Sequence, residues 1–217
     1  VRHIDHKSFT CTVEAGKIVM PFEEELNAIG LSFPHYPASA EWASVGGSVA
    51  ARGSGVLSTK YGTMQDHVLS AEIVLANGDI VQMPSVPRHG VGPDLTQLFS
   101  GSEGTLGIIT AVTVKLRPLP TQRRFLAMGF ADLAAGVEAG RRIMTEASHP
   151  AVMRFYDKPA ATQSLNKAVG ADIAGETMVI MYDGSHSALI DAEVAVARQI
   201  CEEEGGRLLD GDIGPQW

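Results

Sequence analysis

The segment 37–62 combines glycine and serine residues in a pattern that suits close contact with an anionic ligand. It holds five glycines and five serines among 26 residues, and the apolar residues between them are mostly small. Ser44 suits the N-cap of a short helix over 45–52, whose unpaired N–H groups beside Gly46 and Gly47 would attract a phosphate. The alternative is a glycine-rich turn before an ordinary buried helix, in which both glycines only permit close packing.

A second glycine-rich turn, GSEGTLGIIT at 101–110, leads directly into β-branched residues and carries Glu103 at its tip. A carboxylate in this position accepts hydrogen bonds from ribose hydroxyls, or equally caps the turn in which it lies. Both roles stay open for Glu103. The presence of two such stretches favours ligand binding over simple packing.

Three ordered motifs resemble the flavin domain of the vanillyl-alcohol-oxidase type of FAD-linked oxidases. They are SVGGSVAARGSG, KYG followed by Asp66, and GSEGTLGIIT with LRPLP behind it. Arg-Gly-Ser-Gly at 52–55, Pro-Arg at 87–88 and Gly-Pro-Asp at 92–94 are more similar to the alkyldihydroxyacetonephosphate synthase branch than to the lactate or glycolate dehydrogenases. The resemblance covers nearly the whole chain.

The resemblance implies an α+β fold with FAD as cofactor. Residues 1–120 correspond to the second subdomain of a PCMH-type FAD-binding domain, and residues 121–217 to part of a ferredoxin-like βαβ cap domain over the substrate. The family domain is longer than this chain. We therefore expect the first FAD loop to precede Val1 and the catalytic C-terminal part to follow Trp217, so that the isolated chain binds FAD weakly and has no turnover.

The same resemblance assigns residues to the cofactor. The motif equivalent to 37–43 runs along the flavin and its diphosphate, 50–54 is a further flavin contact, and 103–109 holds the adenosine end through main-chain groups. The family's Pro-Asp-Ser is Pro-Ala-Ser here, so the contact of the acid is missing. The expected cofactor-binding residues are Pro37, Ser39, Ser44, Gly46, Gly47, Ala50, Arg52, Gly53, Ser54, Gly55, Gly62, Glu103, Gly104, Thr105, Gly107, Ile108 and Ile109.

Two arginines are candidates for the substrate, because substrates of this branch carry a phosphate and a guanidinium binds phosphate bidentately. Arg154 lies in an apolar strand, where a salt bridge to Asp157 or another acid is the alternative. Arg88 matches a family arginine near the flavin, and an ordinary exposed loop charge is the alternative.

The implied reaction exchanges an acyl for an alkyl group on dihydroxyacetone phosphate through a flavin adduct. Family members place a tyrosine and a histidine cluster for proton transfer in the C-terminal part, so the catalytic residues of this chain are unknown. Two alternatives remain: an FAD-linked dehydrogenase of 2-hydroxyacids such as lactate or glycolate, and a truncated module without catalysis.

Composition restricts the partners. The net charge of -8 argues against nucleic acid, which requires a basic surface. No apolar run reaches the roughly 18 residues of a transmembrane segment, and no signal peptide is visible, so a cytoplasmic enzyme is expected, with membrane-peripheral attachment of the full-length form left open. We expect a small-molecule substrate, either a phosphorylated glycerone derivative or a hydroxy acid; a homodimer stays open. The spacing of Cys11, Cys201, His3 and His6 predicts no metal site or disulfide.

The first half of the chain reads as short strands and helices around the two glycine-rich stretches. Alternation predicts strands at 9–14 and 108–116, and Asn77-Gly78 predicts a hairpin within 68–83. Pro21 and Gly30 punctuate a helix between them, and 95–99 forms a turn of helix. The prolines and polar residues at 118–124 predict a linker.

The second half contains two βαβ patterns. Strands are expected at 125–130, 151–156, 177–182 and 207–209, and helices at 132–147 and 187–204. This order predicts a ferredoxin-like sheet with its helices on one side.

Overall fold

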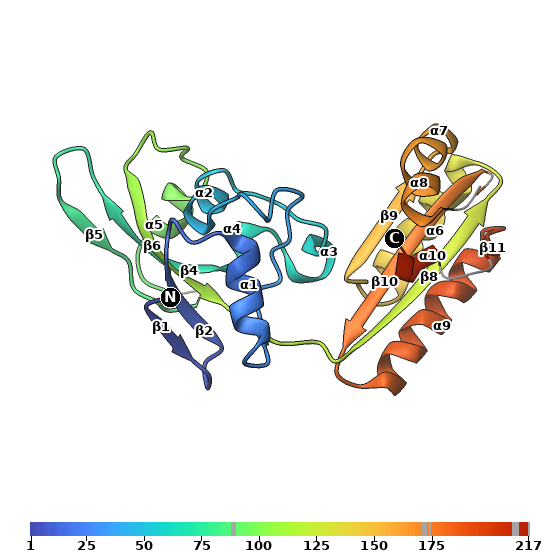
Figure 1. Cartoon of the computed structure of the whole chain (residues 1–217), viewed down its shortest axis with the longest axis horizontal. Helices are drawn as coiled ribbons and strands as arrows, with labels where there is room; N and C mark the ends of the chain where they lie inside the picture. The colour runs from blue at the N-terminus through green and yellow to red at the C-terminus, as the bar shows by residue number, and fades with distance from the viewer. Residues whose placement is uncertain (88–89, 171–172, 174, 210–212, 217) are drawn as a thin grey trace. The chain divides into compact units, whose positions relative to one another are not determined.

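The computed structural model describes residues 1–217 apart from 88–89, 171–172, 174, 210–212 and 217. The chain divides into two compact units, Val1–Leu119 and Pro120–Trp217 (Figure 1). Within the described ranges, no helix has the length and apolar composition needed to cross a bilayer.

The first unit contains a five-stranded antiparallel sheet with the order β1-β2-β6-β4-β5. Its strands are β1 (His3–Asp5), β2 (Thr10–Glu14), β4 (Val68–Val74), β5 (Ile80–Gln82) and β6 (Ile108–Lys115). A separate short pair joins β3 (Leu31–Ser32) to β7 (Arg117–Pro118). The accompanying helices are α1 (Val19–Asn27), α2 (Val45–Ala50), α3 (Ser58–Tyr61), α4 (Met64–His67) and α5 (Leu95–Phe99).

Alternating side chains give this sheet an apolar and a polar face, as the sequence pattern predicts. Cys11 of β2 and Val112 and Val114 of β6 are buried in one core with apolar residues of α1 and α2. On the opposite face, the hydroxyls of Thr12 and Thr113 are hydrogen-bonded at 2.9 Å across the two strands. The core therefore holds the helices, α2 among them, against one side of the sheet.

Helix α1 begins before Pro21, the residue that was predicted to mark its start. Its first residue is Val19, and Ile18 occupies the N-cap without a side-chain hydrogen bond. Val19 and Phe22 are both buried, so burial of the apolar face decides where this helix starts. Pro21 is tolerated in the first turn, where an N–H has no intrahelical partner.

The predicted hairpin is present between β4 and β5. The register pairs Val74 with Ile80, and the N–H of Gly78 donates to the carbonyl of Leu75 at 2.9 Å. Gly78 has a φ of 88°, which glycine adopts readily. The Asn77-Gly78 signal is thereby confirmed.

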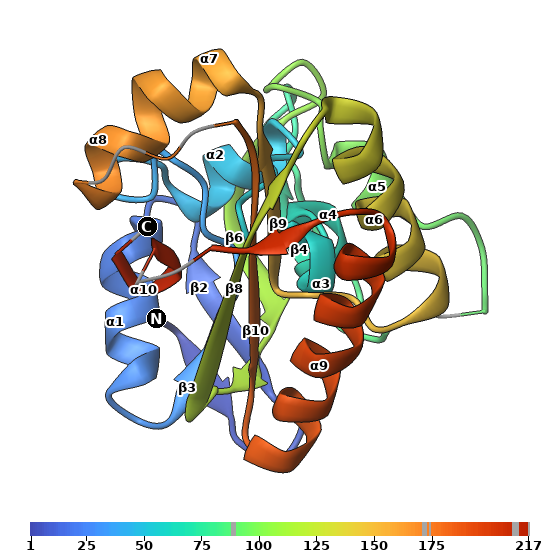
Figure 2. The same ribbon diagram turned by 90° about the vertical axis from the view of Figure 1, so that its right-hand side faces the viewer.

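The second unit is a four-stranded antiparallel sheet with the order β11-β8-β10-β9, which is the ferredoxin-like arrangement. The strands are β8 (Gln122–Phe130), β9 (Val152–Tyr156), β10 (Glu176–Gly184) and β11 (Arg207–Leu208). Helices α6 (Leu133–Glu146) and α9 (Ser187–Glu203) pack on one face, and Figure 2 shows α9 lying along the strands. The predicted α+β class and the ferredoxin-like sheet are confirmed.

The prediction of helices on one side only is wrong. The opposite face is covered by α7 (Lys158–Ala160), a π-helical turn η1 (Ala161–Leu165), α8 (Asn166–Val169) and α10 (Ile213–Gln216). Ala127 and Val179 of the central strands are buried against these elements. A strand that is covered on both faces is apolar at nearly every position, and β10 shows this pattern.

The connection between the units is shorter than the predicted linker at 118–124. Pro118 belongs to β7, and the N–H of Leu119 donates to the carbonyl of Gly30 at 2.9 Å. On the other side, the N–H of Thr121 donates to the carbonyl of Gly184 at 3.1 Å, and β8 begins at Gln122. Polar composition at 121–124 therefore marks the exposed end of a strand.

Candidate functional site

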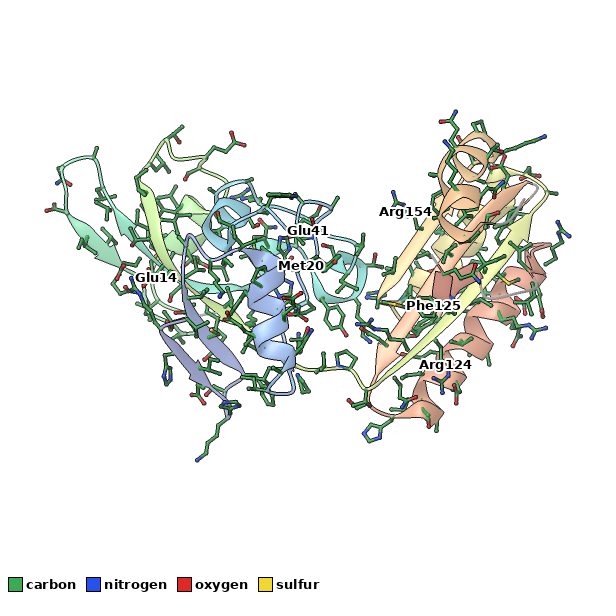
Figure 3. All side chains as sticks on the ribbon, viewed as in Figure 1. Glu14, Met20, Glu41, Arg124, Phe125 and Arg154 are labelled. Carbon is green, nitrogen blue, oxygen red and sulfur yellow. The ribbon has the colours of Figure 1, made fainter. Side chains whose placement is uncertain are left out.

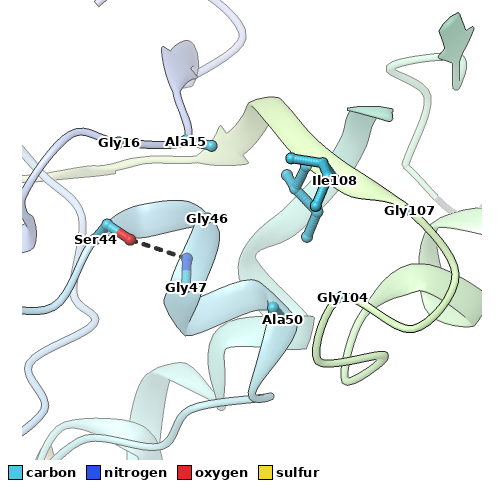
Figure 4. A pocket seen from close by; sticks show the side chains of 10 residues that line it. Ala15, Gly16, Ser44, Gly46, Gly47, Ala50, Gly104, Gly107 and Ile108 are labelled. Atoms are coloured by element: carbon cyan, nitrogen blue, oxygen red, sulfur yellow. Dashed lines mark hydrogen bonds between the residues drawn. The ribbon is translucent and has the colours of Figure 1, made fainter. Parts of the chain in front are cut away.

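Three segments that lie far apart in the sequence surround a pocket of about 300 Å³ in the first unit (Figure 4). The turn after β2, helix α2, and the turn that enters β6 form its wall. Eight lining residues belong to the predicted cofactor set, namely Ser44, Gly46, Gly47, Ala50, Gly104, Gly107, Ile108 and Ile109. The structure thus brings the two glycine-rich stretches together at one place.

Two further lining residues, Ala15 and Gly16, were missed by the sequence analysis, which treated them only as the end of a strand. The packing of α2 against the sheet carries this turn to the pocket. The sequence signal for these residues was a glycine directly after a strand. Such a glycine indicates a turn, but it does not show which other segment that turn will face.

The start of α2 differs from the expected anion site. Ser44 is the N-cap as predicted, and its Oγ accepts a hydrogen bond from the N–H of Gly47 at 3.1 Å. The N–H groups of Val45 and Gly46 donate to the carbonyls of Lys17 and Ala15, both at 2.8 Å. The expectation of unpaired N–H groups in this first turn is therefore wrong, because the chain itself uses them.

The structure of Gly46 agrees with the alternative reading, in which this glycine permits close packing. A Cβ built on it would lie 2.5 Å from the Cβ of Ala15 and 3.0 Å from its Cα, so only glycine allows α2 to approach that turn. Gly47 is exposed, and a Cβ there would meet only the Oγ of Ser44, at 2.9 Å. The two adjacent glycines thus have different tasks.

Gly16 and Gly104 leave room for a ligand. A Cβ built on either would meet no heavy atom within 4 Å, and the N–H of neither is used by a backbone hydrogen bond among the described residues. Across the pocket from α2 lies Ile108, an apolar side chain that is 63% exposed (Figure 4). Open glycines, free donors and an exposed apolar wall suit a flat ring with polar edges, such as part of a flavin dinucleotide.

The turn at 101–107 is fastened to the end of α2. The N–H groups of Gly101 and Glu103 donate to the carbonyls of Val49 and Ala50 at 3.0 and 3.1 Å. Glu103 is exposed with a φ of 48°, and its carboxylate accepts no hydrogen bond within the described part of the chain. The capping alternative for Glu103 is therefore not seen.

Arg52 lies beyond the pocket lining. Its Nε donates to the carbonyl of Ser100 at 2.8 Å and its Nη2 to that of Gln97 at 2.9 Å. Its φ of 49° is left-handed, so the expected helix over 45–52 ends at Ala50. The structure thus gives Arg52 hydrogen bonds to the segment directly before the second glycine-rich turn.

The remaining predicted cofactor residues also lie beyond the pocket lining; they are Pro37, Ser39, Gly53, Ser54, Gly55, Gly62 and Thr105. Several shape local turns. A Cβ on Gly55 would lie 2.5 Å from the carbonyl of Tyr36, and Gly62 has a φ of 89° before the capping box of Thr63 and Asp66. Thr105 donates through Oγ1 to the carbonyl of Ser102 at 2.6 Å.

Two buried histidines, His35 and His67, pack against Phe33 in the first unit. The rings of His35 and His67 are 6.4 Å apart between centroids, and Phe33 contacts both. Burial lowers the pKa of each imidazole to about 4. The ring of His35 also borders Gly53, where a Cβ would lie 3.5 Å from its Nε2. Both histidines are therefore neutral at physiological pH, and sequence reasoning gave neither a role.

Arg154 is on β9 in the second unit and is exposed (Figure 3). Its guanidinium lies 5.4 Å from the centroid of the Tyr156 ring, a cation–π contact. Asp157, the alternative partner, caps α7 by accepting from the N–H of Ala160, and no ion pair of Arg154 occurs among the residues described. Arg88, the other substrate candidate, lies outside the described residues.

Comparison with protein families identifies two domains. A profile described as FAD binding domain matches residues 1–84, and one described as FAD linked oxidases, C-terminal domain, matches residues 119–209. The two matched segments lie within the first and second units respectively, apart from residue 119.

Curated relatives include a synthase, an oxidase subunit and a dehydrogenase. The chain is 37% identical over 154 residues to alkyldihydroxyacetonephosphate synthase of Caenorhabditis elegans, covering 71% of the chain and 26% of the relative. It is 29% identical over 205 residues to glycolate oxidase subunit GlcD of Bacillus subtilis (94% and 44%). It is 32% identical over 196 residues to mitochondrial D-lactate dehydrogenase [cytochrome] of Arabidopsis thaliana (89% and 34%). The chain therefore spans less than half the length of each.

Among solved structures, an alkyldihydroxyacetonephosphate synthase superposes with a TM-score of 0.83 at 23% identity. The match covers 100% of this chain and 42% of that one. At this identity the match establishes the fold, including the PCMH-type arrangement expected from the sequence.

Proposed function

Because the chain belongs to the FAD-linked oxidases of the vanillyl-alcohol oxidase superfamily, we propose that it is the FAD-binding and cap portion of an enzyme resembling alkyldihydroxyacetonephosphate synthase. Such an enzyme exchanges an acyl for an alkyl group on dihydroxyacetone phosphate. FAD is the cofactor of this family, and it supplies the electrophilic ring that the exchange requires. Residues 1–120 bind the cofactor in this proposal, and residues 121–217 cover the substrate.

The observation that carries the proposal is the meeting of both glycine-rich stretches at one pocket. We assign this pocket to the adenosine end of FAD. Its volume, about 300 Å³, is at the lower end of small-molecule sites, which run roughly from 300 to 1,000 Å³, so it holds only part of a dinucleotide. Ile108 and Ile109 contact the ring, and the N–H groups of Gly16 and Gly104 bind its polar edge or the ribose.

The substrate phosphate is assigned to Arg154. Arg154 is exposed and its guanidinium lies over a tyrosine ring, and a guanidinium can bind phosphate through a bidentate contact. The same scaffold in a 2-hydroxyacid dehydrogenase is the second candidate. It is favoured by the similarity to the glycolate oxidase subunit and the D-lactate dehydrogenase, which covers more of this chain.

Gly16→Val tests the cofactor site. The new side chain enters open space at a residue whose φ lies outside the left-handed region, so the fold is preserved while the pocket is filled. We expect FAD content per chain, read from flavin absorbance of the full-length enzyme, to fall at least tenfold, while the melting temperature of the cofactor-free protein stays unchanged. Gly90→Val is the matched control, since a Cβ there also meets nothing and Gly90 is outside the pocket. Full flavin content in Gly16→Val would refute the site.

Product analysis separates the two activities. Full-length enzyme supplied with an acyl-dihydroxyacetone phosphate and a long-chain alcohol should release the fatty acid and form the ether product. Arg154→Ala should raise the KM for this phosphorylated substrate more than it lowers kcat. Reduction of the bound flavin by lactate or glycolate, without ether product, would favour the dehydrogenase instead. Purified protein without flavin absorbance would favour the remaining alternative, a truncated module without catalysis.

A further inference from the structure

Arg52 has a backbone conformation that arginine rarely adopts. Its φ of 49° places it in the left-handed region, directly after the C-cap of α2. Strain of this kind persists where surrounding contacts outweigh it. The contacts of Arg52 therefore indicate what the strained conformation achieves.

Among the described residues, the hydrogen bonds of its guanidinium go to the segment that precedes the 101–107 turn. The Nε and Nη2 atoms donate to the carbonyls of Ser100 and Gln97 at 2.8 and 2.9 Å. The stem of the side chain lies flat on Gly101, where a Cβ would come within 2.8 Å of the Arg52 Cδ. Gly101 itself has a φ of 82°. A strained arginine and a left-handed glycine are thus packed against each other.

Two backbone bonds complete this junction. The N–H groups of Gly101 and Glu103 donate to the carbonyls of Val49 and Ala50, the last residues of α2. Ala50 lines the pocket on one side of the junction and Gly104 on the other. A change in the position of the turn relative to α2 would therefore change the width of the pocket.

We propose that Arg52 is a positioning residue that fixes the 101–107 turn against α2 and so shapes the nucleotide pocket before FAD binds. The inference rests on the proposed assignment of this pocket to FAD. It differs from the family-based expectation for Arg52, because the guanidinium acts through the turn and not by touching the flavin. Its value for binding is preorganisation: a turn that is already fixed loses less conformational entropy when the nucleotide enters.

Arg52→Gly separates the side chain from the strain. Glycine adopts the left-handed conformation readily, so this variant loses the guanidinium without adding backbone strain. In the cofactor-free protein, we expect the amides of Gly101 and Glu103 to exchange hydrogen at least about tenfold faster, as expected when a charge-assisted bond is removed. The affinity of the full-length protein for FAD should fall by about tenfold or more, and the melting temperature should change little.

Arg52→Lys retains one charged donor and should recover part of the FAD affinity. Arg117→Ala removes an exposed arginine from the same unit and should leave both readings unchanged. Lower FAD affinity in Arg52→Gly with unchanged amide exchange would mean that Arg52 contacts the cofactor directly, which overturns the inference. Unchanged exchange and affinity would overturn it as well. Faster amide exchange in Arg52→Gly, in a protein that binds no FAD even as wild type, would support the positioning of the turn by Arg52 and refute only the proposed function.

Discussion

Lowering the pH from about 7.5 to about 5 should reduce the free energy of unfolding of the first unit, because His35 and His67 are buried as neutral imidazoles. Their side chains are 1% and 3% exposed, and both nitrogens of His35 and Nε2 of His67 have no hydrogen-bond partner among the described residues. Burial lowers the pKa of each from 6.5 to about 4. Between these pKa values the unfolded chain binds protons that the folded chain does not. The free energy of unfolding therefore decreases as the pH is lowered.

The magnitude follows from the two pKa values. At pH 5 the unfolded imidazole is almost fully protonated and the folded one is almost fully neutral, which lowers the free energy of unfolding by about 2 kcal/mol per histidine. The two together lower it by about 4 kcal/mol relative to pH 7.5. The loss is complete only below about pH 4, where the folded imidazoles also take up protons.

The assay is hydrogen exchange of β6 amides in increasing urea, which reports on the first unit separately from the second. Wild type, His35→Leu, His67→Leu and the double variant are each compared with themselves at the two pH values, so any change in packing cancels. Each single substitution should remove about half of the pH dependence. His6→Gln, at an exposed histidine, is the control. An undiminished pH dependence in the double variant would refute the reasoning.

Three further substitutions test the packing of glycines. Gly46→Ala should lower the free energy of unfolding of the first unit by about 1–3 kcal/mol in urea denaturation, because its Cβ would overlap Ala15; wild-type stability would contradict this. Gly136→Ala should lower the melting temperature of the second unit, because its Cβ would overlap the ring of Phe155. Overpacking costs roughly 1–3 kcal/mol, which exceeds the roughly 1 kcal/mol that alanine gains over glycine in helix propensity. Gly140→Ala, whose Cβ would lie 3.5 Å from Met153, should be neutral or stabilising, and equal losses in both variants would show that the Phe155 contact is not the cause.

Local signals in the sequence were strong where one residue type decides the backbone. Ser44 as N-cap and the Asn77-Gly78 hairpin are confirmed, since each depends on the chemistry of its nearest neighbours. Hydrophobic periodicity likewise located the helices of the second unit, and the strand order confirms the ferredoxin-like sheet. The start of α1 was misplaced because burial of Val19 outweighed the proline signal.

The candidate site was predictable in part. The resemblance carried by the two glycine-rich stretches identified eight residues that now line one pocket, but it gave them a common role that their environments divide. Among these eight, Gly46 serves packing and Gly104 leaves open space. Residue type alone does not distinguish these two tasks, because glycine is equally suited to both.

The sequence by itself determined the family, the cofactor and the class of fold, because these depend on motifs and periodicities that are written along the chain. Only the tertiary structure decided which donors remain available to a ligand. The N–H groups at the start of α2 are used by the carbonyls of Ala15 and Lys17, residues some 30 positions away in the sequence. A hydrogen bond that a helix start makes to a distant segment leaves no local trace in the sequence. The structure alone therefore shows that the donors at the start of α2 are used, and that the N–H of Gly16 makes no backbone hydrogen bond among the described residues.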